Sequence, residues 1–179
     1  MRLAYADPPY PGCAHLYRDH PDYAGEVDHT ALLASLYEDF DGWCLHTSSP
    51  QLAAVLGMVE EFEIEDVRVM AWVKPFAAFK ANVSVAYAWE PMLVKAARKP
   101  TVTNRMVYRD WIAEPITLQR GLTGAKPERV CQFLFEVMGC RPDDELVDLF
   151  PGTGAVTAAW EKWRRQPSLF GHLSASGHE

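Results

Sequence analysis

Apolar residues recur along this chain with two periods, one typical of strands and one typical of helices. Four short apolar runs predict buried strands, at residues 2–6, 42–46, 67–73 and 145–150. Four segments with apolar residues at helical spacing predict helices, beginning near Thr30, Ser49, Pro127 and Gly154. Thr30 and Ser49 are good N-cap residues, and a proline fits the first turn of a helix.

Strands that alternate with helices predict βαβ units, in which a mostly parallel sheet has helices on both faces. We therefore expect an α/β fold of the doubly wound, Rossmann-like type. Residues 85–97 predict one or two further strands, and a strand is expected near 107–112. The 179 residues suit one domain, with a basic insertion at about 95–125 and no separate block large enough for target recognition.

A glycine-containing loop follows the predicted strand that ends near Phe150. It reads Asp148-Leu149-Phe150-Pro151-Gly152-Thr153-Gly154 and leads into the last helix. Gly152 permits a sharp turn, and Gly154 permits a ligand to approach the backbone. The N–H groups at the start of the helix favour an anionic group, while Asp148 favours an amine. A tight turn without a ligand is an equal alternative.

A second loop, Asp7-Pro8-Pro9-Tyr10, ends the first predicted strand. Its two prolines fix two φ angles and remove two donors, so the rim offers the Asp7 carboxylate and the Pro8 carbonyl as acceptors. Tyr10 adds a flat face. Such a rim fits a planar ring with an exocyclic amine, because two acceptors draw the amine hydrogens and Asp7 can take a proton. The alternative is a turn stiffened by proline.

Together the two loops resemble those of the S-adenosylmethionine (SAM)-dependent amino-methyltransferases of the N6-adenine and N4-cytosine class. Asp7 to Tyr10 matches their (D/N/S)-P-P-(Y/F/W) motif, and Asp148 to Gly154 matches D-x-F-x-G-x-G. Lys126-Pro127 matches the dipeptide that opens the helix before the cofactor strand. The motif order resembles the permuted β-type arrangement, and the resemblance covers residues 3–163.

The resemblance implies that Asp7, Pro8, Pro9 and Tyr10 form the catalytic motif. It also implies a cofactor pocket for SAM, formed by Asp148, Phe150, Gly152, Gly154 and Lys126. The implied activity is methylation of adenine N6 in DNA, since tyrosine at the fourth motif position occurs with adenine targets. The family's acidic residue for the cofactor ribose has no counterpart here, because the acidic residues after Gly154 are Glu161 and Glu179.

Charge is unevenly distributed, although the net charge of −7 alone argues against a nucleic-acid partner. Residues 1–66 hold 13 acidic and 2 basic residues, whereas residues 67–130 hold 11 basic and 4 acidic residues. We expect a basic loop over the catalytic rim that binds the nucleic-acid backbone. The candidate contacts in this region are Lys74, Arg98, Lys99 and Arg105. A solvated basic loop is the alternative.

The remaining features predict a cytoplasmic protein without a metal or a membrane segment. The start of the chain does not resemble a signal peptide, and the longest uncharged run, 42–59, is too polar to span a membrane. The four cysteines, Cys13, Cys44, Cys131 and Cys140, have no zinc-site spacing and are expected as free thiols.

Two other functions remain open from the sequence. One is N-methylation of RNA, of cytosine N4 or of a small aryl amine. The other is a catalytically weak, methyltransferase-like subunit that binds nucleic acid, which the missing ribose acid favours. A homodimer or a recognition partner would supply a target-recognition surface.

Overall fold

A computed structural model describes residues 1–10, 14, 18, 25–75, 84–100, 107–117 and 125–165. Its six strands form one sheet in the order β5-β3-β4-β2-β1-β6. The strands are β1 (Arg2–Ala6), β2 (Gly42–His46), β3 (Val67–Val73), β4 (Trp89–Lys95), β5 (Trp111–Ala113) and β6 (Glu145–Asp148). The helices are α1 (His29–Asp39), α2 (Leu52–Glu61, preceded by a 3-10 turn at Ser49–Gln51), α3 (Glu128–Val137) and α4 (Ala155–Trp163).

The sheet is mixed but mostly parallel. The pairs β1–β2, β1–β6 and β3–β5 are parallel, whereas β4 is antiparallel to both β2 and β3. The carboxyl ends of β1, β2, β3, β5 and β6 therefore meet at one edge, which we call the carboxyl edge. The start of β4 lies at that edge, and its last residue, Lys95, lies at the opposite edge beside Val67 and Trp43.

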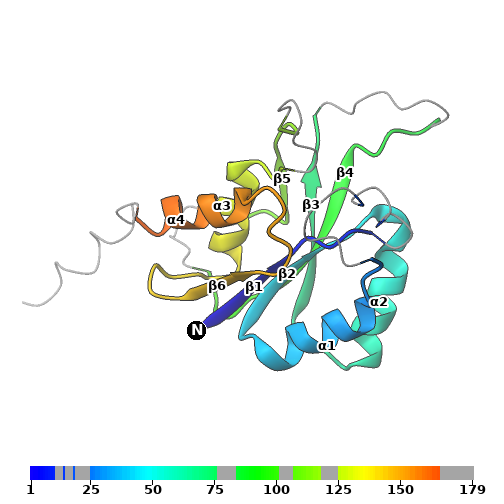
Figure 1. Ribbon diagram of the computed structural model, residues 1–179, viewed down its shortest axis with the longest axis horizontal. Coiled ribbons are helices and arrows are strands. Elements are labelled where there is room, and N and C mark those ends of the chain that lie inside the picture. The colour runs from blue at the N-terminus through cyan, green and yellow to red at the C-terminus, as the bar shows by residue number, and fades with distance from the viewer. Residues whose placement is uncertain are drawn as a thin grey trace, which may run out of the picture.

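Helices cover both faces of the sheet, with α1 and α2 on one side and α3 and α4 on the other (Figure 1). Along β1, Ala4 and Ala6 belong to the core under α1 and α2, while Tyr5 belongs to the core under α3 and α4. This alternation follows from the two-residue period of a strand. The predicted fold class is confirmed, as is the predicted adjacency of the first and last strands.

Local details differ from the sequence prediction where capping decides the outcome. The N-cap of α1 is Asp28, whose carboxylate accepts hydrogen bonds from the backbone N–H groups of Thr30 and Ala31, so the prediction of Thr30 was wrong. Within residues 84–97 there is one strand, β4, since only Trp89–Lys95 pairs with neighbouring strands. In the described part of the chain, no helix is both long and apolar enough to cross a membrane.

Candidate active site at the carboxyl edge

The predicted catalytic motif leaves the sheet at the carboxyl edge. β1 ends at Ala6, and Asp7 follows with its side chain 23% exposed. Pro8 is buried, while Pro9 and Tyr10 are half-buried. The motif therefore presents a carboxylate that is anchored to the sheet and still accessible from solvent.

The glycine loop lies on the neighbouring strand at the same edge. Tyr5 of β1 is in register with Asp148 of β6, and the Leu149 N–H donates to the Tyr5 carbonyl at 2.9 Å. Asp7 lies two residues beyond Tyr5, so the structure brings the two predicted motifs together. This adjacency was the geometric requirement for a shared site.

The glycine loop itself has the conformation that its two glycines allow. Gly152 has φ of +46° and Gly154 has φ of +73°, which are left-handed values. Among the described residues, a Cβ at Gly154 would meet nothing within 4 Å, and one at Gly152 would approach only the Phe150 carbonyl, at 3.8 Å. The space beside the backbone at the start of α4 is therefore open to a ligand.

Asp148 is held inside this loop by weak local contacts. Its two carboxylate oxygens accept from the Phe150 N–H at 3.3 Å and from the Thr157 hydroxyl at 3.4 Å. Burial raises the pKa of Asp148, and these two hydrogen bonds only partly oppose the rise. A cationic or amine-bearing ligand would stabilise the ionised form.

Lys126 lies beside the predicted catalytic motif, in contact with two carboxylates. Its ammonium is 2.8 Å from Asp7 Oδ2 and 3.0 Å from Glu90 Oε1, and its side chain is only 8% exposed. The resemblance implied that Lys126 lines the cofactor pocket, whereas these contacts join it to Asp7 of the predicted catalytic motif. The ammonium thus links β1 to β4.

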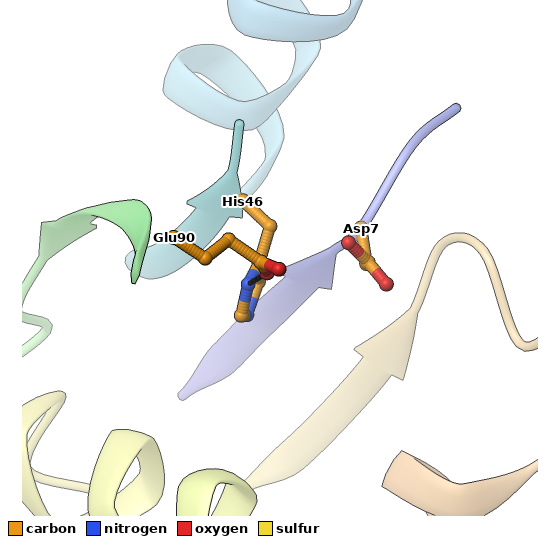
Figure 2. A group of neighbouring side chains, drawn as sticks. All are labelled: Asp7, His46 and Glu90. Carbon is orange, nitrogen blue, oxygen red and sulfur yellow. Dashed lines mark hydrogen bonds and ion pairs between the residues drawn. The ribbon is translucent and has the colours of Figure 1, made fainter. Parts of the chain in front are cut away.

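Glu90, a buried residue of β4, contacts three basic side chains. His46 Nδ1 lies 2.6 Å from its Oε1, and Lys74 donates to its Oε2 at 2.8 Å. Lys126 completes the set. Figure 2 shows the Glu90 and His46 side chains close together, with Asp7 just beyond the end of β1.

The charges of this cluster are mutually stabilising. Burial alone would raise the pKa of Glu90, but Lys126, His46 and Lys74 outweigh it and keep that pKa well below the usual value. Burial likewise opposes the charge on Lys126, but Asp7 and Glu90 together raise its pKa. Glu90 and Lys126 are therefore each stabilised in the charged form.

Trp72 forms one wall of the cluster. The ammonium groups of Lys74 and Lys126 lie 4.5 Å and 5.4 Å from the centre of its ring. The Trp72 indole N–H donates to the Glu114 carbonyl at 2.7 Å, which fixes the ring. Cation–π attraction adds to the ion pairs that hold both lysines.

Asp7, His46 and Glu90 also have a spacing that metal sites show, with one donor atom from each lying within 4.8 Å of the others. The Lys126 ammonium, however, contacts two of these three groups, Asp7 and Glu90. The position of a cation between the carboxylates is thus taken by a lysine, and we do not assign a metal site here.

The predicted backbone-binding residues do not lie together. Lys74 belongs to the site, as a partner of Glu90. Arg98 lies at the opposite edge of the sheet, where it donates to both oxygens of Asp144, at 2.6 and 3.0 Å, and to the Gly139 carbonyl. Lys99 is exposed next to Arg98, and Arg105 lies outside the described residues. Arg98 therefore does not lie over the catalytic rim, contrary to what we expected of the basic segment.

Three site residues were not identified from the sequence, namely His46, Glu90 and Trp72. His46 ends an otherwise apolar strand, and Glu90 is the one acidic residue in the run Trp89-Glu90-Pro91-Met92-Leu93-Val94. A charged residue inside an apolar strand is rarely buried without a partner. That rule indicates that His46 and Glu90 have polar partners, but it does not identify these partners.

Fold and site together define a Rossmann-like α/β protein with a charged site at the carboxyl edge, where open α/β sheets bind their ligands. No family model matches the chain, and no curated protein does. The chain is similar to the solved structure of M1.HpyAVI in complex with SAM, with a TM-score of 0.61 and 17% identity over 93% of this chain and 80% of that one. Another M1.HpyAVI structure matches with a TM-score of 0.55 and 13% identity, over 92% and 76% of the two chains. At such low sequence identity, the structural likeness shows a common fold and nothing beyond it.

Proposed function

We propose that this chain is a SAM-dependent methyltransferase that acts on the exocyclic amine of a nucleobase, with N6 of adenine in DNA as the target. The observation that carries the proposal is the pairing of β1 with β6, which places Asp7 to Tyr10 beside the loop of Gly152 and Gly154. The solved structure of the same fold with SAM supports the choice of cofactor.

The residues of the glycine loop fit SAM. The open space beside Gly152 and Gly154 allows a ligand to contact the backbone. Asp148 offers a carboxylate whose ionised form an ammonium group would stabilise. In this proposal Asp148, Phe150, Gly152 and Gly154 hold the cofactor, which supplies an activated methyl group on a sulfonium.

The catalytic motif would bind and activate the amine. Asp7 and the Pro8 carbonyl would each accept one amine hydrogen, and Tyr10 would stack on the ring. The amine nitrogen forms its bond to the methyl carbon as the sulfur–carbon bond breaks, and that electron pair returns to sulfur. The nitrogen then loses a proton to Asp7. Positioning and electrostatics are the protein's contribution.

RNA or a small aryl amine is the second candidate substrate class. The position of Arg98 favours it, because one of the cations expected to bind a DNA backbone is instead paired with Asp144 at the opposite edge. The site itself recognises an aryl amine and does not distinguish these sources. DNA would require the target base to be flipped out or single-stranded.

Methyl transfer from labelled SAM tests the proposal. Duplex DNA, single-stranded DNA, RNA and free nucleosides are each incubated with the wild-type protein, with Asp7→Ala and with Glu145→Gln. Glu145 is exposed and lies at the other end of the sheet, so that variant should behave as wild type. We expect label on adenine N6 in DNA and a loss of about 100-fold or more in Asp7→Ala, in the range for removing a general base. Label on RNA or nucleosides alone would establish the second candidate, and SAM binding without transfer would contradict both.

A further inference from the structure

Glu90 and Asp7 lie close together, with an oxygen of each within 4.8 Å of the other, and they share a partner. Lys126 touches both carboxylates, with Asp7 Oδ2 at 2.8 Å and Glu90 Oε1 at 3.0 Å. The Lys126 ammonium is almost fully buried, so these two carboxylates and the Trp72 ring replace its water shell. The position of the ammonium therefore depends on both carboxylates.

A buried carboxylate such as that of Glu90 is costly. Taking an ion out of water is repaid only when its partners and hydrogen bonds are well placed, and an apolar residue of similar volume is often equally stable. Glu90 has partners on three other segments: His46 at the end of β2, Lys74 after β3, and Lys126 before α3. A carboxylate with partners on three segments is better suited to fix their relative positions than to add stability.

The two lysines on Glu90 differ in one respect. Lys126 contacts Asp7 as well as Glu90 Oε1. Lys74 contacts the second oxygen of Glu90, Oε2. Glu90 thus has its own counter-ion in Lys74. The Lys126 ammonium is shared between Asp7 and Glu90. The ion pair with Lys126 therefore orients Asp7, while Glu90 neutralises part of the positive charge on Lys126.

We propose that Glu90 is a positioning residue for methyl transfer, which acts through Lys126 to orient the Asp7 carboxylate toward the substrate amine. Glu90 holds the ammonium, the ammonium holds Asp7 Oδ2, and Trp72 limits the movement of both lysines. This inference rests on the proposed function for its catalytic readout. It assigns Lys74 to Glu90 rather than to a phosphate of the substrate.

A double-mutant cycle tests the coupling. Single variants Glu90→Gln and Lys126→Met should each lower kcat about 10-fold or more with little change in the KM for SAM, because orientation of a catalytic group acts mainly on the chemical step. The double variant should lose no more than Lys126→Met alone, within about twofold, because contacting residues are not additive. Losses that multiply would overturn the proposal, as would a kcat of Glu90→Gln equal to that of wild type.

Further variants separate positioning from general damage to a buried ion-pair cluster. Lys74→Met also breaks an ion pair of Glu90 but leaves Lys126 on Asp7, so we expect a clearly smaller loss of kcat than in Lys126→Met. Lys126→Arg should recover part of the activity lost in Lys126→Met. Equal losses in Lys74→Met and Lys126→Met would show that cluster integrity alone matters, and would overturn the proposal.

A readout without catalysis keeps this inference distinct from the proposed function. The Lys126 ammonium should give an observable side-chain NMR signal at neutral pH. A buried ammonium that is held by two carboxylates exchanges its protons with water slowly. The signal should broaden in Glu90→Gln and in Asp7→Asn and stay unchanged in Glu145→Gln. If the wild type transfers no methyl group but the NMR signals change as expected, the proposed function fails and the coupling of Glu90 to Asp7 through Lys126 stands. An unchanged Lys126 signal in Glu90→Gln refutes this coupling.

Discussion

The two edges of the sheet both hold buried ion pairs, but they use them differently. At the opposite edge, Asp144 accepts hydrogen bonds from Arg98, from the Arg141 N–H and from the Met1 amino group, and its side chain is 2% exposed. At the carboxyl edge, Asp7 is 23% exposed although it is held by Lys126. A closed carboxylate stabilises the fold, whereas an open one is available for a substrate.

The backbone around Arg98 is consistent with a structural role. Gly139, just after α3, has φ of +72°, and a Cβ there would overlap the Arg98 carbonyl. The chain after β4 thus packs closely against the end of α3, and Arg98 bonds the Gly139 carbonyl in return. At the carboxyl edge, by contrast, the glycines of the loop have open space beside them.

The same substitution at the two edges gives the largest expected difference. Asp7→Asn should lower methyl transfer by about 100-fold or more, because the amide cannot take the proton. It should lower the free energy of unfolding by less than Asp144→Asn does, because Lys126 keeps Glu90 as a charged partner. Asp144→Asn should lower the free energy of unfolding by about 3 kcal/mol, because Arg98 is left paired with a neutral group in a buried place. Its activity per folded molecule should remain near that of wild type.

Chemical denaturation and labelled methyl transfer, measured on the same preparations, check both halves of this comparison. Glu145→Gln, which changes an exposed carboxylate of β6, serves as the reference for a surface ion pair of little energetic weight. A large loss of activity in folded Asp144→Asn would mean that the two edges are not functionally separate.

A smaller effect is expected from the glycine loop. Gly154→Ala places a Cβ on a residue with φ of +73°, which costs about 1–2 kcal/mol of strain. The added methyl group also enters the open space where the proposed cofactor contacts the backbone. We therefore expect modest destabilisation together with a raised KM for SAM, measured by denaturation and by saturation kinetics. Unchanged SAM kinetics would argue that the cofactor lies elsewhere.

The sequence predicted the fold and the meeting of the two motifs because both depend on local patterns at strand ends. It did not predict the cluster around Glu90, whose partners are 16, 36 and 44 residues away in the sequence. The prediction for Arg98 failed for a directional reason. Because β4 runs antiparallel to its neighbours, residues after Lys95 leave the sheet at the opposite edge. Apolar patterning identifies a strand but not its direction.

The smallest expected effect is the pH dependence of the stability that Asp144 contributes. A comparison of wild type with Asp144→Asn separates this contribution from the general loss of stability in acid. Burial would raise the pKa of Asp144, but Arg98, the Met1 amino group and the Arg141 N–H together lower it below its ordinary value of 3.8. A carboxyl group whose pKa is lowered on folding stabilises the protein above its unfolded pKa, and that stability is lost as the pH falls toward the folded pKa. Asp144→Asn removes this contribution at every pH.

The difference in unfolding free energy between wild type and Asp144→Asn should therefore be constant near neutral pH and shrink below about pH 4. Denaturation curves at intervals between pH 7 and the acid limit of folding give this difference directly. Glu90, whose pKa is also lowered, contributes equally to both proteins and cancels in the difference. A difference that stays constant into the acid range would show that Asp144 stabilises the opposite edge through packing and hydrogen bonds rather than through its charge.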